Sequence, residues 1–323
     1  MVQHAALSLK TALMPDPTEQ RDSHAALNRS AALASMAVAA LLVCLKGWAA
    51  WSTGSSAMLG SLADTALDLV ASLATLAGVW IAAQPEDSGH RFGHGKAEAM
   101  AAMFQVTLIS ISAFWLAAHA VQQFAAGTRT QAAESGIGVS LIAMAATLAL
   151  LAWQRRVLRR TGNLAIAADH LHYQSDLLLN LAVIAALALD RFGGFALADP
   201  LFALAIAAWL ARGAWLASQK ATAQLMDAEW PEEKRRRFLA VIARHPRLRG
   251  VHDLRTRTSG DRDFAQFHVW VDPDMTVRDA HRVMDEIEQA LKAGFPGVET
   301  IIHTDPEGHR DAGMAERDLL ADP

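Results

Sequence analysis

Cysteine is almost absent from this sequence, since Cys44 is the only one among 323 residues. A single thiol cannot form a disulfide within the chain, and it cannot build a cysteine-based zinc site. Cys44 lies inside an apolar block, where a thiol acts as a small buried hydrophobic group. Any metal that the chain binds is therefore expected on histidine and carboxylate side chains.

The sequence also lacks an excess of positive charge, because its formal net charge is −4. This balance gives no reason to expect nucleic acid as a partner. The charges are unevenly placed instead. Residues 30–218 form long apolar blocks, whereas the chain from Asp227 onward is charged and alternating. This division predicts that one part of the chain lies in lipid and the other in water.

A secretory signal is missing as well, since the first two dozen residues are polar and interrupted by proline. We expect residues 1–28 to form a flexible cytoplasmic tail, and residues 307–323 to form a second flexible tail. Between them we expect a transmembrane domain over residues 29–220 and a cytoplasmic domain over residues 227–306.

Six apolar blocks are long enough to cross a bilayer, which takes about 20 residues. They predict a polytopic α-helical membrane domain of six transmembrane helices. The blocks are Ala31–Trp51, Ala57–Ala83, Ala99–Phe124, Ile137–Trp153, Leu164–Leu189 and Ala196–Ser218.

Lysine and arginine gather in the loops on one side of these blocks, which the positive-inside rule makes the cytoplasmic side. The opposite loops contain only Arg129 and Arg191. We therefore expect a multi-pass membrane protein with both termini in the cytoplasm. The cytoplasmic set is Arg21, Arg29, Arg91, Lys96, Arg155, Arg156, Arg159, Arg160 and Lys220.

Two pairs of ionisable residues lie at membrane depth, where each costs about 2.5–3.5 kcal/mol to insert and is usually functional. Asp64 and Asp68 occupy the second block, and His172 and Asp176 occupy the fifth. Each pair is spaced i, i+4, so both members share one helix face. Three carboxylates and one imidazole would suit tetrahedral zinc. The alternative is that they form helix–helix hydrogen bonds or lie near the headgroups.

Three further ionisable residues lie in the blocks, and the first two are interpreted as structural. Lys46 lies toward the outer end of the first block, where its side chain can snorkel to the interface. His119 is expected to be a satisfied interior residue. His170 either accepts protons as an auxiliary group or is incidental.

The loop between the second and third blocks reads QPEDSGHRFGHGKAE. Asp87, His90 and His94 are spaced so that one turn or short helix could gather them around a metal. A solvated loop that happens to contain histidines is the alternative.

The segment after Asp227 contains short elements in the order helix, strand, strand, helix, strand. They predict a small α+β (αββαβ) domain with its helices on one face of a three-stranded sheet. A strand of alternating apolar residues over 263–272 carries His268 on its opposite face. Five side chains that could meet only in the fold are His252, His268, His281, His303 and Asp305. Scattered surface histidines are the alternative.

These motifs resemble those of the cation diffusion facilitators, close to the bacterial branch that exports zinc and ferrous iron. The motifs are SLADTALDLVASL, QPEDSGHRFGHGKAEA, LHYQSDLLLN, HDLRTR and IIHTDP, and the match covers Ser30 to Pro306. The resemblance implies a homodimer in a bacterial inner membrane, with a metallochaperone-like cytoplasmic domain. Two residues depart from the family pattern. Close relatives have a longer side chain at the position of Thr304, and His170 is an additional histidine that the pattern does not contain.

The resemblance also assigns sites to the residues above. It implies a transport site at Asp64, Asp68, His172 and Asp176, and a loop site at Asp87, His90 and His94. It implies a binuclear cytoplasmic site, with Asp305 as a bridge, at His252, His268, His281, His303 and Asp305. Lys96 and Asp227 match a charge interlock at the dimer's membrane–cytoplasm junction.

Metal ligands bind only when deprotonated, so a metal and protons compete for one site. An imidazole titrates near pH 6.5, which makes His172 a suitable switch. We expect zinc export in exchange for protons. Cadmium, ferrous iron, cobalt and manganese are also compatible with these ligands, although the imidazole favours zinc.

Three other functions remain open from the sequence. A membrane-bound zinc enzyme would need an open coordination position and a nearby base. A metal sensor without transport would not need paired charges at membrane depth. A channel would conduct slowly through such tight ligation. The sequence leaves the number of protons per metal open.

Overall fold

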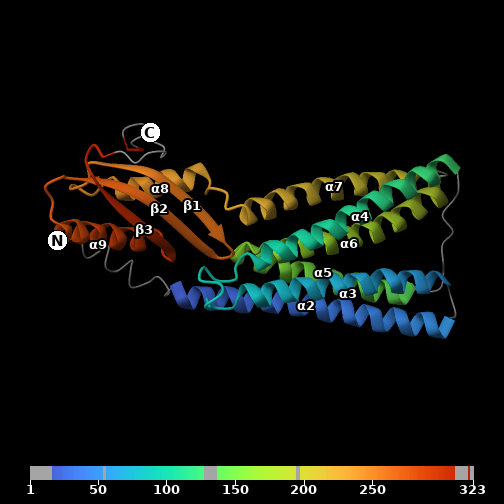
Figure 1. Ribbon diagram of the computed structural model, residues 1–323. Coiled ribbons are helices and arrows are strands. Elements are labelled where there is room, and N and C mark those ends of the chain that lie inside the picture. Colours follow the sequence, from blue (N-terminus) through green and yellow to red (C-terminus); the bar gives the residue numbers. More distant parts are fainter. Residues whose placement is uncertain (1–16, 54–55, 127–136, 194–196, 310–318, 321–323) are drawn as a thin grey trace, which may run out of the picture. The chain divides into compact units, whose positions relative to one another are not determined.

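The computed structural model describes residues 17–53, 56–126, 137–193, 197–309 and 319–320. It divides into two compact units, of which one is His24–Leu225 and the other combines Met226–Pro323 with Met1–Ser23. In the first unit, long helices run side by side in a bundle (Figure 1). The helices are α2 (Pro17–Thr53), α3 (Ser56–Ala82), α4 (Ala97–Ala126), α5 (Ile137–Thr161), α6 (Leu164–Gly193) and α7 (Ala198–Leu225).

Five of these helices are long and apolar enough to cross a membrane, within the described residues. Helix α6 is not among the five, and its N-terminal half contains Asp169, His170, His172 and Asp176. The spans are Glu19–Ser52, Ser61–Ala82, Ala97–Ala125, Leu141–Thr161 and Ala198–Leu225.

Helix α2 begins well before the predicted block that starts at Ala31. Pro17 opens it and Glu19 lies in its first turn, and both residue types are favoured at a helix N-terminus. Residues 17–28, which the sequence analysis assigns to a tail, are therefore helical.

Small residues allow two pairs of helices in the bundle to approach closely. A Cβ atom on Gly78 of α3 would lie 2.3 Å from the Cβ of Ala101 on α4. A Cβ atom on Gly213 of α7 would lie 2.9 Å from the side chain of Leu171 on α6. Helices in lipid associate through close packing of this kind, because burying apolar side chains there gains little.

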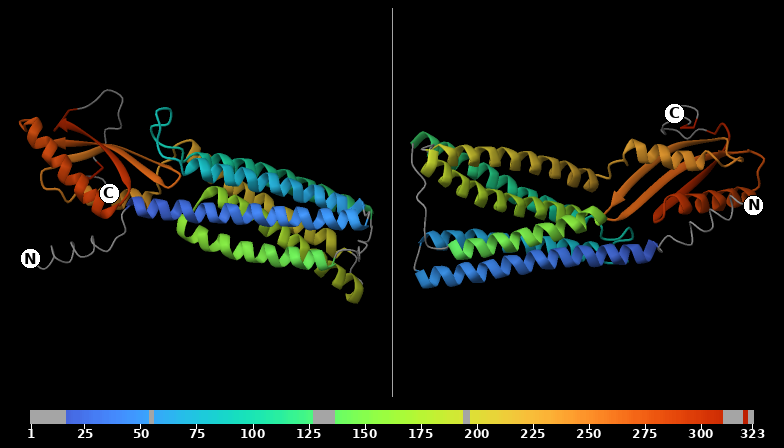
Figure 2. Two further views of the ribbon diagram at one scale, coloured as in Figure 1. Left: turned by 90° about the horizontal axis from the view of Figure 1, so that it is seen from below. Right: turned by 180° about the vertical axis from the view of Figure 1, so that it is seen from behind.

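The second unit is a three-stranded sheet with two helices. The elements follow the predicted αββαβ order: α8 (Glu232–Ile242), β1 (Gly250–Ser259), β2 (Arg262–Val271), α9 (Val277–Gly294) and β3 (Val298–Pro306). Strand β2 is central, antiparallel to β1 and parallel to β3. Figure 2 shows this sheet from two further sides.

Alternation along β2 separates the two faces of the sheet. Ala265, Phe267, Val269 and Val271 face the helices and form one buried core with Phe238, Ile242, Val283 and Leu291 from α8 and α9. His268 alternates with these residues and therefore lies on the face away from the helices. The predicted small α+β domain with its helices on one face is confirmed.

Candidate metal centres

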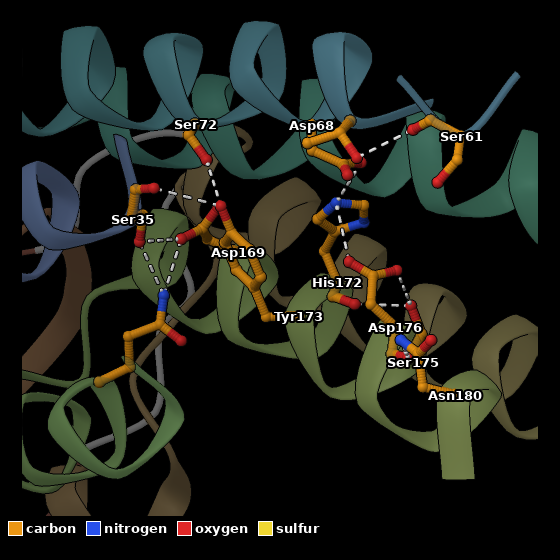
Figure 3. A network of polar contacts seen from close by, with 12 residues as sticks. Ser35, Ser61, Asp68, Ser72, Asp169, His172, Tyr173, Ser175, Asp176 and Asn180 are labelled. Atoms are coloured by element: carbon orange, nitrogen blue, oxygen red, sulfur yellow. Dashed lines mark hydrogen bonds and ion pairs between the residues drawn. The ribbon is translucent and has the colours of Figure 1, made fainter. Parts of the chain in front are cut away.

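Three polar side chains from two helices meet inside the helical unit (Figure 3). The Nε2 of His172 lies 2.9 Å from Oδ1 of Asp68 and 3.7 Å from Oδ2 of Asp176. One ligand atom from each residue lies within 4.8 Å of the other two. His172 and Asp176 share a face of α6, whereas Asp68 reaches them from α3. An imidazole and two carboxylates at this separation suit a divalent transition metal.

These three side chains line a cavity of about 520 Å³, to which all six helices of the unit contribute lining residues. Asp64 lines the same cavity, but it is not among the residues whose ligand atoms form the close group. The structure thus brings three of the four predicted transport-site residues together. Asp64 as the fourth ligand stays a prediction.

Lys46 lines the cavity as well, so it does not extend away from the bundle as a snorkelling side chain would. Its Nζ donates a hydrogen bond of 2.6 Å to Oγ1 of Thr65 on α3. Thr65 is buried and lies between Asp64 and Asp68 in the sequence. The structure thus adds a contact with α3 to the structural interpretation of Lys46.

A buried carboxylate that the sequence analysis missed lies one helical turn from His172. Asp169 is fully buried, and its Oδ2 accepts hydrogen bonds from Ser35 Oγ at 2.6 Å and Gln154 Nε2 at 2.7 Å. Its Oδ1 has no hydrogen-bond partner among the described residues. Spacing was the available signal, because Asp169, His172 and Asp176 follow the i, i+3, i+7 pattern of one helix face.

Tyr173 extends this buried network to a fourth helix. Its hydroxyl donates to the backbone oxygen of Ser35 at 3.2 Å and lies 3.0 Å from Oγ of Ser72 (Figure 3). The network therefore joins α2, α3, α5 and α6. The cavity-lining residues of α6 run from His172 toward its C-terminus, so the network closes the cavity toward the N-terminus of α6.

The predicted loop residues lie together between α3 and α4. Oδ1 of Asp87 is 3.3 Å from Nδ1 of His90, and Oδ2 of Asp87 is 3.3 Å from Nε2 of His94. The backbone N–H of His90 donates to the carboxylate at 2.6 Å and that of Gly89 at 2.8 Å. These hydrogen bonds, led by that from His90, lower the pKa of Asp87 below its ordinary value. The deprotonated form that a metal requires is thus favoured.

The third cluster lies on the sheet of the second unit, where the pairing of the strands brings its residues together. His252 of β1 pairs with His268 of β2, which pairs with His303 of β3, so three imidazoles lie in one row across the sheet. Asp305 is two residues further along β3. Its Oδ2 lies 3.3 Å from Nε2 of His252 and 2.9 Å from Nδ1 of His268. Its Oδ1 lies 3.3 Å from Nε2 of His303.

The other residues predicted near this row lie elsewhere. His281 is an exposed residue of α9, on the helix-bearing side of the sheet, and its Nε2 is 3.8 Å from Oδ2 of Asp285. Thr304 pairs with the core residue Val269, so its side chain lies on the face away from the histidine row. The role of His281 in the cytoplasmic site stays a prediction. The side chain of Thr304, which differs from the family pattern, does not contact the row of histidines.

Lys96 and Asp227, the predicted interlock, lie in the two separate units. The Nζ of Lys96 donates to the backbone oxygen of Leu225 at 3.2 Å, and Asp227 lies 3.5 Å from Arg257. The interlock stays a prediction.

His119 stacks on Trp115 with ring centroids 5.3 Å apart, and Nδ1 of His170 lies 3.0 Å from Oε1 of Gln154. Neither histidine joins a metal-ligand group of the described residues.

Comparison with known families covers both units. The model of the cation efflux transmembrane domain matches residues 32–226. The chain belongs to the cation efflux family. The model of the cytoplasmic domain of cation efflux proteins matches residues 230–307. Helix α6, with its ionisable residues, therefore lies in the family's transmembrane domain.

Relatives in this family cover nearly the whole chain. The cation-efflux pump FieF of Pectobacterium atrosepticum is 43% identical over 283 residues, which are 88% of this chain and 94% of the relative. FieF of Klebsiella pneumoniae is 41% identical over 284 residues, with the same coverage. A solved structure of CzrB in its zinc form is 44% identical, with a TM-score of 0.24, and covers 26% of this chain and 96% of its own. This cation efflux protein is thus a multi-pass membrane transporter of cations and not an enzyme.

Proposed function

We propose that this chain exports divalent metal, with zinc as the preferred substrate, from the cytoplasm in exchange for protons. The observation that supports this most strongly is the position of His172, 2.9 Å from one carboxylate and 3.7 Å from another inside a cavity of the helical unit. We assign the transport site to Asp64, Asp68, His172 and Asp176. Cadmium, ferrous iron, cobalt and manganese remain candidate substrates.

Competition for these side chains couples the two ions. A carboxylate or imidazole that holds a proton cannot bind the metal, so binding releases protons and protonation releases the metal. Exchange of one dication for two protons moves no net charge. Exchange for one proton moves a positive charge outward, which costs about 2.3 kcal/mol per 100 mV against an interior-negative membrane. An electroneutral exchange is therefore the less costly cycle.

Alternating access supplies the direction of transport. The cavity extends from His172 toward the C-terminus of α6, and the Asp169 network closes the other end. With both termini in the cytoplasm of a bacterium, this cavity faces outward. Binding from the cytoplasm then requires that the contacts of Tyr173 with Ser35 and Ser72 separate.

The loop and cytoplasmic clusters are proposed as metal sites that regulate transport in a homodimer. His252 and Asp305 are both buried, and the row of imidazoles offers nitrogen donors that suit zinc. Metal at the row and the interlock of Lys96 with Asp227 would stabilise one dimeric state. His281 lies on the other side of the sheet within one chain, so we propose that it joins the site from the second copy. A regulatory effect of this kind requires that the metal binds the two states with different affinity.

An imposed proton gradient tests the exchange. Sealed proteoliposomes loaded with buffer at pH 6 and diluted into pH 7.5 buffer with zinc should accumulate zinc above the external concentration. An ionophore that dissipates the pH gradient should abolish this accumulation. Zinc that only equilibrates, at a rate that ignores the gradient, would contradict proton coupling.

A further inference from the structure

Lys46 brings a basic side chain into the cavity of the proposed transport site. Its Nζ lies 2.6 Å from Oγ1 of Thr65, a buried residue that follows Asp64 directly in α3. The side chain of Lys46 lines the same cavity as Asp64, Asp68 and Asp176. The lysine comes from α2, so it is independent of the two helices that supply the ligands.

The hydrogen bond from Lys46 to Thr65 does not by itself require a charged side chain at this position. The hydrogen-bond partner of Lys46, Thr65, offers a neutral hydroxyl, which an uncharged donor would satisfy equally well. An ammonium group at membrane depth is costly unless opposite charges compensate it. The carboxylates of the cavity are those opposite charges, so the lysine and the carboxylates form one electrostatic unit.

Counting the charges of this unit gives a specific value. Among the described residues that line the cavity, the charged ones are three aspartates and one lysine. Three negative charges and one positive charge leave −2 when His172 is neutral. A divalent cation brings the total to zero, whereas without the lysine the occupied cavity would retain a charge of −1.

We propose that Lys46 is the residue that sets the charge of the transport site to match a divalent cation. Its repulsion weakens the hold of the three carboxylates, so that the bound dication can leave in each cycle. This role rests on the proposed function, because it assumes that the cavity binds a dication in transit. Lys46 acts on the metal through its charge and is not a ligand.

Removal of the charge should tighten binding and slow release. At the separations within one cavity, repulsion between a single charge and a dication changes affinity by at least about tenfold. We expect Lys46→Met and Lys46→Gln to lower the Kd for zinc by that factor and to lower both KM and kcat. Lys46→Arg keeps the charge and should stay near the wild-type values.

Thr65→Val provides the control for a merely structural role. It keeps the lysine side chain and removes the 2.6 Å hydrogen bond from Lys46, together with the 3.1 Å hydrogen bond from Thr65 Oγ1 to the backbone oxygen of Ser61. We expect it to shift the Kd for zinc several-fold less than Lys46→Met. Lys46→Gln can still donate a hydrogen bond to Thr65, so it provides a second neutral variant if Lys46→Met fails to fold.

The experiment is competition between the purified full-length chain and a zinc-binding dye, with His90→Ala and His268→Ala present to weaken the other two clusters. Binding that Asp68→Ala removes is assigned to the cavity. Tighter binding in both neutral variants, with wild-type values in Lys46→Arg, supports the inference. Unchanged affinity in the neutral variants, or an equal shift in Thr65→Val, overturns it and leaves the proposed function standing. Binding that Asp68→Ala does not affect overturns both.

Discussion

The imidazole of His172 on α6 and the carboxylate of Asp68 on α3 lie 2.9 Å apart, in a cavity lined by six helices. A helical turn separates this pair from Asp169, whose carboxylate is fully buried among α2, α5 and α6. The helical unit thus contains two layers of polar side chains. The layer at His172 is open to the cavity, and the layer at Asp169 is closed by hydrogen bonds.

Ser35→Ala should destabilise the bundle, because it removes a donor to a buried carboxylate whose Oδ1 already has no partner among the described residues. The expected loss is about 1–3 kcal/mol. Thermal unfolding in detergent measures it. Ser110→Ala is the matched control, since that hydroxyl donates only to the backbone of its own helix at Val106. Equal shifts in the two variants would contradict the role of the Asp169 layer.

Gly78→Ala should disrupt the packing of α3 on α4. The new Cβ would lie 2.3 Å from Ala101, so the helices must separate at a cost of about 1–3 kcal/mol. Gly47→Ala is the control, because its Cβ would meet nothing closer than Leu62 at 3.9 Å. That control should be neutral or stabilising by up to about 1 kcal/mol, since alanine is the better helix former. Comparable melting temperatures for both variants would show that α3 and α4 are not in close contact.

His268→Ala should raise the zinc concentration that half-activates transport, because it removes the central imidazole of the row and a contact of Asp305. The expected increase is tenfold or more, as for the loss of a group that supports a metal site. The measurement is zinc transport against free zinc buffered on the cytoplasmic side. His245→Ala is the control, since its Nε2 pairs with Glu286 away from the row. An unchanged zinc dependence in His268→Ala would contradict a regulatory role.

Asp87→Asn should loosen the loop between α3 and α4. The carboxylate accepts the backbone N–H groups of Gly89 and His90 with one oxygen and approaches His94 with the other. The amide is a weaker acceptor than an ionised carboxylate. Hydrogen exchange of the loop amides should therefore become faster by about threefold or more, roughly 0.5–1 kcal/mol for the weakened hydrogen bonds. Protection equal to that of the wild type would show that Asp87 does not order the loop.

Sequence periodicity was sufficient for most of the fold. Apolar blocks of bilayer length identified the helices of the bundle, and alternation along residues 263–272 identified β2 and its two faces. The same alternation separated His268 from the core. Spacing of i, i+4 identified His172 and Asp176, because a helix face is a local property of the chain.

The remainder depends on contacts between helices, which spacing within one helix does not determine. The sequence gives only the depth of Lys46 in its helix, whereas its hydrogen-bond partner Thr65 belongs to another helix. Asp169 gave a local signal that was missed, but its partners Ser35 and Gln154 come from two other helices. Asp64 and His281 present the same difficulty. Whether each one joins its proposed site depends on residues of other elements, which a spacing rule does not identify.

The central claim is that metal and protons exchange at the site of Asp68 and His172. The most direct test is simultaneous measurement of zinc entry and proton exit in sealed proteoliposomes, with a trapped zinc dye and a trapped pH dye. We compare the wild type with Asp68→Ala, and with Asp261→Ala as a control on an exposed carboxylate in the turn between β1 and β2. Opposed, saturable fluxes in the wild type and the control, reduced by about a hundredfold in Asp68→Ala, are the predicted result. Zinc movement without proton movement, or full exchange in Asp68→Ala, would contradict the claim.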